Sequence, residues 1–176
     1  MGSRLPTEEE ALKILRKSGC STDVINHCKA VSKLAVELAR KLNDKGLKID
    51  LELVKVGALL HDIGRAKTHT VDHVIVGSKI ARSLGLPRSI ISIIERHAGG
   101  GITNEEAKDL GWPEGVYTPQ TLEEKIVCYA DKLIGGTKRI PLEKTLKDLA
   151  LKLGEDHPAL ERLRKLDEEI RKLLED

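Results

Sequence analysis

Helical periodicity runs through nearly the whole chain, with apolar residues recurring three and four positions apart. Several such segments begin with a threonine that precedes a glutamate by three residues, which is the capping-box pattern that starts a helix. No alternating pattern of useful strand length, no internal repeat and no linker between two cores is present. The sequence therefore predicts an all-α bundle of eight or nine helices in a single domain over 1–176, with C-terminal helices at 141–175 packed on a central region at about 26–134. The expected helices lie at about 7–19, 22–43, 51–61, 72–83, 87–97, 103–110, 121–134, 142–153 and 158–174.

The composition indicates an aliphatic core. Apolar residues make up 40% of the 176 residues, whereas the aromatic residues are one tryptophan, two tyrosines and no phenylalanine. The net charge is only +2, and positive and negative residues are interspersed along the chain. Because strong nucleic-acid binding depends on an extended positive surface, we expect none here. No apolar run approaches the ~18 residues of a membrane span, and residues 1–10 are polar and acidic, unlike a secretory signal.

The three cysteines favour a reducing compartment. Cys20, Cys28 and Cys128 are an odd number, and no C-x-x-C pair occurs among them. Because disulfides persist mainly in oxidising compartments, we expect reduced thiols in a cytoplasmic protein that has no membrane partner.

Histidines and aspartates occupy positions on the apolar faces of the predicted helices. They are His27, His61, His73, His97 and Asp131, with Asp62 directly after His61 at a helix end. Burying one unpartnered polar group costs about 2–7 kcal/mol, which is large against the ~5–15 kcal/mol net stability of a typical domain. Taken singly, each histidine is better explained as a core residue whose hydrogen bonds are satisfied, and Asp131 as a helix-end or salt-bridge residue. Together they must bond to one another or share cations, and imidazole and carboxylate are preferred ligands of divalent metals.

These residues lie within motifs of a known family. The segment 57–65, GALLHDIGR, resembles the signature of the HD-domain superfamily in its HDIG form. His73 with Gly77 resembles the family's H-x-x-x-G element, and YADKL at 129–133 is similar to its last metal-binding motif. The resemblance covers about 26–134, and the loop at 101–124 is similar to that of a compact archaeal HDIG family of predicted hydrolases. The full ligand pattern of the family is matched in order by His27, His61-Asp62, His73, His97 and Asp131.

The resemblance implies a helical bundle with divalent metal at its centre. Carried over motif by motif, the ligands of the first ion would be His27, His61, Asp62 and Asp131. Asp62 would bridge to a second ion bound by His73 and His97, and the H-x-x-x-G spacing favours His73 over the nearby His69 for this role. Because members without the two middle histidines tend to bind one metal, we expect two ions here, chosen from Mn, Fe, Co, Ni or Zn, with Mg as a further candidate.

The activity implied is that of a metal-dependent phosphohydrolase acting on a phosphomonoester or phosphodiester, with a nucleotide or a related small metabolite as the expected substrate. Two cations ~3.5–4 Å apart suit in-line displacement at phosphorus by a metal-activated hydroxide. Asp62 and Arg65 are the expected catalytic residues, because a guanidinium suits two phosphate oxygens; a surface arginine is the alternative for Arg65. Lys132 and Arg96 are comparable candidates, but a solvated surface position is the favoured interpretation of Lys132.

Other functions and roles stay open at this point. A di-iron oxygenase of HD type would use the same kind of ligands. A non-catalytic nucleotide-binding signalling module is a second alternative, although modules of that class often lack some ligands. Trp112 and Tyr117 are more readily assigned to packing than to covering a nucleobase, and His157 is expected to be exposed. The apolar stripe of 158–174 fits packing on its own domain, with a homodimer contact as the alternative.

Overall fold

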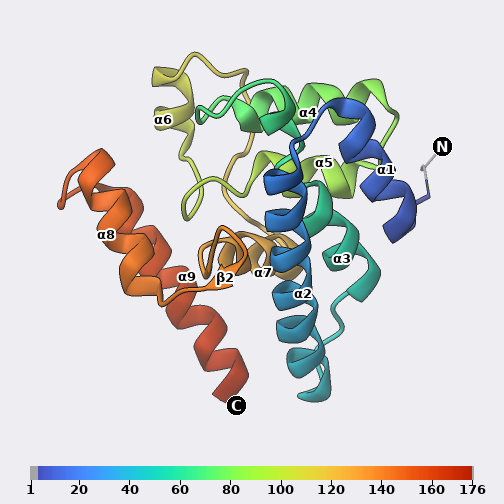
Figure 1. The fold of residues 1–176 in the computed structure, drawn as a ribbon. Coiled ribbons are helices and arrows are strands. Elements are labelled where there is room, and N and C mark those ends of the chain that lie inside the picture. Colours follow the sequence, from blue (N-terminus) through green and yellow to red (C-terminus); the bar gives the residue numbers. More distant parts are fainter. Residues whose placement is uncertain (1–3, 176) are drawn as a thin grey trace.

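The computed structural model describes residues 4–175, so residues 1–3 and 176 lie outside the described part. The first three residues belong to the segment 1–10, which is predicted not to be a secretory signal. The described chain is all-α, as predicted (Figure 1). A 3-10 helix at Ile63–Ala66 and two short strands, β1 at Ile134–Gly135 and β2 at Lys138–Arg139, accompany the helices. The helices are α1 Glu8–Ser18, α2 Thr22–Asp44, α3 Leu51–Leu60, α4 His73–Ser83, α5 Arg88–Glu95, α6 Asn104–Asp109, α7 Leu122–Asp131, α8 Leu142–Leu153 and α9 Pro158–Glu175.

Capping boxes mark where three of the helices begin. Thr7, Thr103 and Thr121 each accept a hydrogen bond from the backbone N–H of the glutamate three residues later. That glutamate accepts a hydrogen bond from the threonine N–H in return. Each capping box therefore satisfies N–H groups that a helix leaves unpaired at its start, and the helix starts predicted from this pattern are confirmed.

Three helices end earlier than the periodicity predicts. α3 ends at Leu60, α5 at Glu95 and α7 at Asp131, whereas the apolar pattern continues to 61, 97 and 134. The chain after α7 forms a small hairpin instead, in which Ile134 pairs with Arg139 and Gly136 adopts a positive φ of 61°. Strands of two residues are too short to show an alternating pattern, so the sequence indicated only a break at Gly135 and Gly136.

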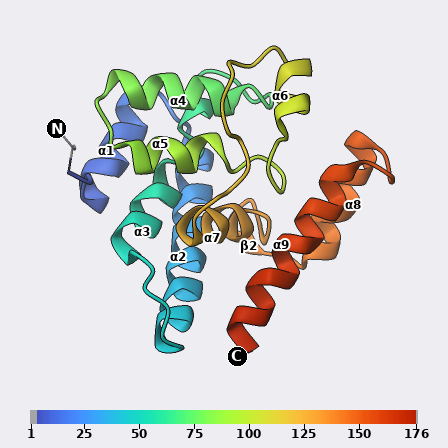
Figure 2. The same cartoon turned by 180° about the vertical axis from the view of Figure 1, so that it is seen from behind.

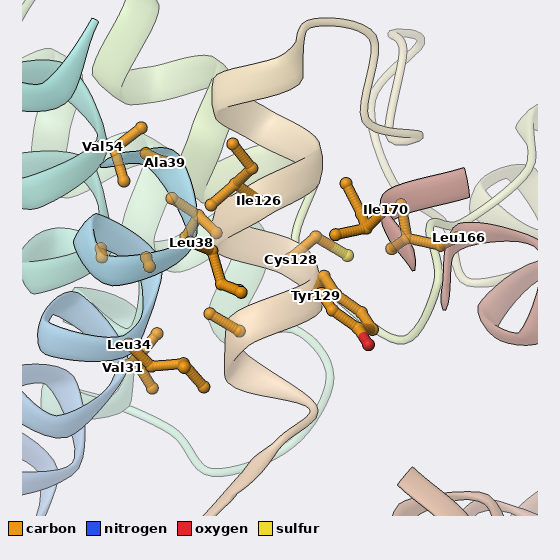
Figure 3. Packing of buried hydrophobic residues seen from close by; sticks show 14 of the residues in the cluster. Val31, Leu34, Leu38, Ala39, Val54, Ile126, Cys128, Tyr129, Leu166 and Ile170 are labelled. Atoms are coloured by element: carbon orange, nitrogen blue, oxygen red, sulfur yellow. The ribbon is translucent and has the colours of Figure 1, made fainter. Parts of the chain in front are cut away.

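The aliphatic core surrounds α7. Figure 3 shows Val31 and Leu38 of α2 on one side of α7, with Leu38 near Ile126, and Leu166 of α9 on the opposite side. α2 also packs along α3, so the three helices α2, α3 and α7 are in mutual contact. The end of α7 is therefore held from two sides, and this end carries Asp131.

α8 and α9 lie side by side at one edge of the molecule (Figures 1 and 2). The hydroxyl of Tyr129 donates a hydrogen bond to Asp167, and Lys125 pairs with Glu169 at 2.7 Å, which joins α9 to α7. The apolar stripe of α9 is covered by the chain itself, which favours packing over a dimer contact for the stripe; its buried members are Leu160, Leu163, Leu166 and Ile170. The single-domain organisation, the homodimer and the cytoplasmic location stay predictions.

The described residues contain neither a candidate membrane span nor a disulfide. Within 4–175, no helix combines the length and the apolar character needed to cross a membrane. Cys20, Cys28 and Cys128 are buried and form no disulfide. Burial raises the pKa of the Cys28 thiol, so this cysteine belongs to the core.

The buried Tyr129 should make the free energy of unfolding depend on pH in the alkaline range. Burial first, and then the hydrogen bond to Asp167, raise the pKa of Tyr129 from 10.0 to about 12. Since the folded state favours the neutral phenol, its contribution is complete below pH 10.0 and is lost as the pH rises through about 12. In urea denaturation, the free energy of unfolding of the wild type should therefore approach that of Tyr129→Phe across this interval. A difference between the two proteins that stayed constant with pH would contradict the expectation.

Candidate metal centre

Six polar side chains from five segments of the chain meet at the centre of the helical bundle. They form two groups that share Asp62, and within each group the potential ligand atoms lie within 4.8 Å of one another. The first group is His27, His61, Asp62 and Asp131; the second is Asp62, His73 and His97. The structure thus brings together all six residues singled out by the sequence, while their role as metal ligands stays a proposal.

Two glycines explain how the second group is assembled. A Cβ on Gly64 would lie 1.8 Å from the carbonyl oxygen of His73, and a Cβ on Gly77 would lie 3.1 Å from the nitrogen of Gly64. Only glycine at 64 therefore allows the first turn of α4 to approach the 3-10 helix, and this approach places His73 beside Asp62. The glycines of the HDIG and H-x-x-x-G elements are thus two sides of one backbone contact.

The first group is arranged around two carboxylates. His27 Nε2 lies 2.9 Å from Asp131 Oδ1 and 3.6 Å from Asp62 Oδ2. His61 Nε2 lies 3.3 Å from Asp131 Oδ1 and 3.4 Å from Asp62 Oδ2. Two imidazole nitrogens and two carboxylate oxygens therefore converge on one point from α2, α7 and the end of α3.

The second group uses the other oxygen of Asp62. His73 Nε2 and His97 Nε2 each lie 3.2 Å from Asp62 Oδ1, and the two nitrogens lie 3.0 Å apart. Asp62 is 3% exposed, and its Oδ1 has no hydrogen-bond donor among the described residues. A buried carboxylate oxygen without a donor is costly, so this oxygen requires a positive partner.

Every histidine of the centre is oriented in the same way. The Nδ1 atoms face backbone carbonyl oxygens, those of Gly136 for His27, Ala58 for His61, Thr70 for His73 and Ile94 for His97. A carbonyl only accepts, so each Nδ1 carries a hydrogen and a neutral ring keeps its lone pair on Nε2. Histidine ligands of metals are held in this manner. Two such lone pairs at 3.0 Å, as in His73 and His97, repel unless a proton or a cation lies between them.

The charges at the centre attract a cation. Burial raises the pKa of Asp62, but the charge of His61 outweighs it and holds that pKa well below the usual range. Burial likewise raises the pKa of Asp131, and the charges of Lys132 and then His61 hold it well below the usual range. Burial lowers the pKa of His97 to about 4, so this ring is neutral near pH 7. Burial also lowers the pKa of His61, but Asp62 and Asp131 outweigh that effect and raise it well above the usual value. The space between the carboxylates thus favours positive charge, and the residues present fit divalent metal.

The favoured interpretation of Lys132 is wrong, because this lysine is buried. Its Nζ donates hydrogen bonds to the carbonyl oxygen of His97 at 2.7 Å and to Asp131 Oδ2 at 2.9 Å. Asp131 therefore presents its other oxygen to the histidines. The sequence carries no local signal for this burial, because α7 ends at Asp131 and Lys132 lies in the turn that follows.

Arg65 lies at the edge of the centre, where the sequence placed it. Its Nε lies 3.3 Å from Asp62 Oδ2, and its side chain is 30% exposed. Arg96 serves a structural contact instead, since it pairs with Glu124 at 3.0 Å and donates to the carbonyl oxygen of Val116. Of the two candidates, only Arg65 can meet a substrate anion at this centre.

The remaining aromatic and histidine assignments are resolved by burial. Trp112 and Tyr117 are buried with ring centroids 5.0 Å apart, and Trp112 donates to Asp72 at 2.8 Å, so they pack the loop rather than cover a ligand. His69 is exposed in the loop before α4. His157 is half-buried rather than exposed, because its Nδ1 accepts a hydrogen bond from the N–H of Ala159 at the start of α9.

A cavity of about 650 Å³ adjoins the centre. Its inner end is lined by His73, His97 and Asp131, and Arg65 lies beside them. Its outer end is lined by residues of α6 and of the α8–α9 pair. This volume lies within the range of about 300–1,000 Å³ typical of small-molecule sites.

Comparisons with known proteins agree with this geometry. A family model described as HD domain matches residues 24–135. An uncharacterized protein of Methanocaldococcus jannaschii is 50% identical over 166 residues, which are 94% of this chain and 98% of that protein. Ribonuclease Y of Acidothermus cellulolyticus is 33% identical over 116 residues, 65% of this chain and 19% of the enzyme.

Two further comparisons concern a longer protein and a solved structure. A tRNA (cytidine(56)-2'-O)-methyltransferase of Thermoplasma volcanium is 44% identical over 92% of this chain, but the chain spans only 46% of that protein. The crystal structure of the L. monocytogenes phosphodiesterase PgpH HD domain in complex with cyclic-di-AMP has a TM-score of 0.57 and 20% identity, covering 93% of each chain. At that identity, the structural likeness establishes the fold alone.

Proposed function

This chain belongs to the HD-domain family, and from that premise we propose that it is a metal-dependent phosphohydrolase that cleaves a phosphomonoester or phosphodiester of a nucleotide or related small metabolite. The observation that carries the proposal is the pair of ligand groups that share the buried Asp62. Their Nε2 atoms all face inward, and the cavity with Arg65 opens beside them. We further propose that the six residues bind two ions, from Mn, Fe, Co, Ni or Zn, with Mg as a further candidate.

The residues of the centre have distinct parts in such a reaction. Two divalent cations would supply Lewis acidity at a phosphoryl oxygen and lower the pKa of an attacking water toward neutrality. Asp62 contributes one oxygen to each group, so it sets the relation between the two positions. Lys132 fixes the orientation of Asp131 through Oδ2. Arg65 lies where its guanidinium can neutralise the charge of a phosphoryl group in the cavity.

The described lining of the cavity offers no serine or cysteine as a competing nucleophile. Cys28 follows His27 in sequence, but its thiol is buried and burial raises its pKa, which disfavours a thiolate. Hydrolysis by an activated water is therefore the reaction that these side chains support best.

The names of the relatives favour phosphoester cleavage. Ribonuclease Y and the PgpH phosphodiesterase are phosphoester-cleaving enzymes by name. The methyltransferase name belongs to proteins of which this chain spans less than half, so we do not propose methyl transfer for this chain.

Elemental analysis of the freshly purified protein, combined with a phosphate-release screen, tests the proposal. The screen covers nucleotides and model diesters with Mn, Co, Ni, Fe, Zn or Mg. We expect bound transition metal and release of phosphate or phosphomonoester. Bound di-iron with oxygen-dependent turnover and no phosphate release would favour the oxygenase, and nucleotide binding without turnover with any metal would favour the signalling module.

His97→Ala should selectively deplete the second metal position. His97 contributes only to the group of Asp62 and His73, so the first group keeps all of its ligands. We expect elemental analysis to fall from two ions per chain toward one. His69→Ala is the matched control, because His69 is exposed in the neighbouring loop and belongs to neither group. Unchanged stoichiometry in His97→Ala, or a loss in His69→Ala, would refute the assignment of His73 and His97.

A further inference from the structure

The outer end of the cavity is lined by apolar side chains that are unusually exposed. Val71, Leu110 and Leu153 are 38%, 43% and 45% exposed, and all three line the cavity. They come from the loop before α4, the residue after α6 and the last residue of α8. We call these three residues the aliphatic wall.

The aliphatic wall combines residues inside and outside the region that the family model matches: Val71 and Leu110 lie within residues 24–135, whereas Leu153 lies beyond them. Leu153 and its neighbours on α8 and α9 follow residue 135, where the family match ends. Both views place the connection between α8 and α9 on the same side of the molecule as α6 (Figures 1 and 2). Exposed apolar side chains from separate segments that gather at a cavity are typical of a binding site.

Polar groups at the cavity point to the chemistry of the ligand. Arg65 and the metal centre at the inner end suit a phosphate. At the outer end, Glu106 Oε1 already accepts a hydrogen bond of 2.6 Å from the guanidinium of Arg162. Asp109 also lines the cavity and has no side-chain hydrogen bond or ion pair among the described residues, so its carboxylate can accept from a hydroxyl or amino group.

We propose that the aliphatic wall binds the base of a nucleoside monophosphate whose phosphate lies at the metal centre. This assignment rests on the phosphohydrolase function proposed above and adds the residues that select the organic half of the substrate. The base packs against Val71, Leu110 and Leu153, which all line this cavity. The ribose hydroxyls or the exocyclic amine lie within the part of the cavity lined by Asp109. A single nucleotide matches a cavity of about 650 Å³ that has one anionic end and one apolar end.

The chain provides a matched control for the key residue. Leu151 lies two positions before Leu153 on α8, is 86% exposed and does not line the cavity. Leu153→Ser and Leu151→Ser therefore make the same chemical change on the same helix, inside and outside the proposed subsite. Both positions are exposed enough that neither substitution should unfold the protein, which a thermal melt verifies.

Calorimetric titration of the metal-loaded protein with AMP, adenosine and inorganic phosphate tests the assignment. We expect AMP to bind the wild type more tightly than either fragment. Leu153→Ser should lower the affinity for AMP and for adenosine by about tenfold, because an apolar contact with the base is lost. Phosphate binding should stay unchanged in Leu153→Ser, and all three affinities should stay unchanged in Leu151→Ser.

The outcomes separate this assignment from the proposed function. Equal effects of the two serine variants, or AMP binding no tighter than phosphate, would overturn the nucleoside subsite even if the protein released phosphate from model esters. A short oligoadenylate that bound far more tightly than AMP would also overturn the assignment to a single nucleotide. Binding as expected, without phosphate release from any ester, would instead refute the hydrolase and support the subsite.

Discussion

Asp62→Ala is expected to abolish metal binding at both positions and all phosphoesterase activity. Asp62 is the one residue common to the two ligand groups, with Oδ2 directed toward His27 and His61 and Oδ1 toward His73 and His97. Its removal takes one ligand from each group and half of the carboxylate charge from the centre. Because metal affinity depends on the number and charge of the ligands, neither group should retain an ion through purification.

The measurement is the metal content per chain together with turnover in the phosphate-release assay. Asp44→Ala is a suitable control, since Asp44 is exposed at the end of α2 and lies far in sequence from every ligand. The circular dichroism spectrum of Asp62→Ala should match that of the wild type treated with chelator, which separates loss of metal from loss of fold. If the variant kept its metal and its turnover, the proposed site would be wrong.

The sequence predicted the parts of this protein that depend on local pattern. Capping boxes located the starts of α1, α6 and α7 because a cap is made by residues three positions apart. The six candidate ligands were recognisable because His and Asp on apolar helix faces cannot be buried without partners. Their order matched a known family, and the structure brings them together.

The parts that the sequence did not predict depend on where the chain goes after a helix ends. Lys132 is buried because α7 ends at Asp131 and the following turn directs the lysine toward the carbonyl oxygen of His97, 35 residues away in sequence. His27 is oriented by the carbonyl oxygen of Gly136, 109 residues away. The aliphatic wall likewise could not be predicted from the sequence, since Val71, Leu110 and Leu153 follow no common periodicity. Contacts between distant segments of this kind leave no local pattern.

Gly64→Ala is expected to be the most destabilising single change near the centre that removes no ligand. The added Cβ would lie 1.8 Å from the carbonyl oxygen of His73 and 2.7 Å from the nitrogen of Gly77. Both are backbone atoms of α4, so a side-chain rotation cannot relieve the overlap and α4 must move away from the 3-10 helix. A clash of this size with backbone falls in the severe range of single substitutions, about 3–5 kcal/mol of unfolding free energy.

The same displacement should also deplete metal at the second position, because the first residue of α4 is His73 and its distance from Asp62 would increase. Gly57→Ala is the matched control, because the atoms nearest its Cβ all belong to the side chain of Ile93 and the one tight contact is with the terminal Cδ1. Alanine also favours a helix interior over glycine by about 1 kcal/mol. Urea denaturation should therefore show a large loss of unfolding free energy for Gly64→Ala and a small change for Gly57→Ala. Elemental analysis should show loss of the second ion in Gly64→Ala only. Comparable stability of the two variants would mean that α4 can move away from the 3-10 helix at little cost, and the backbone contact at Gly64 would then not be what places His73 beside Asp62.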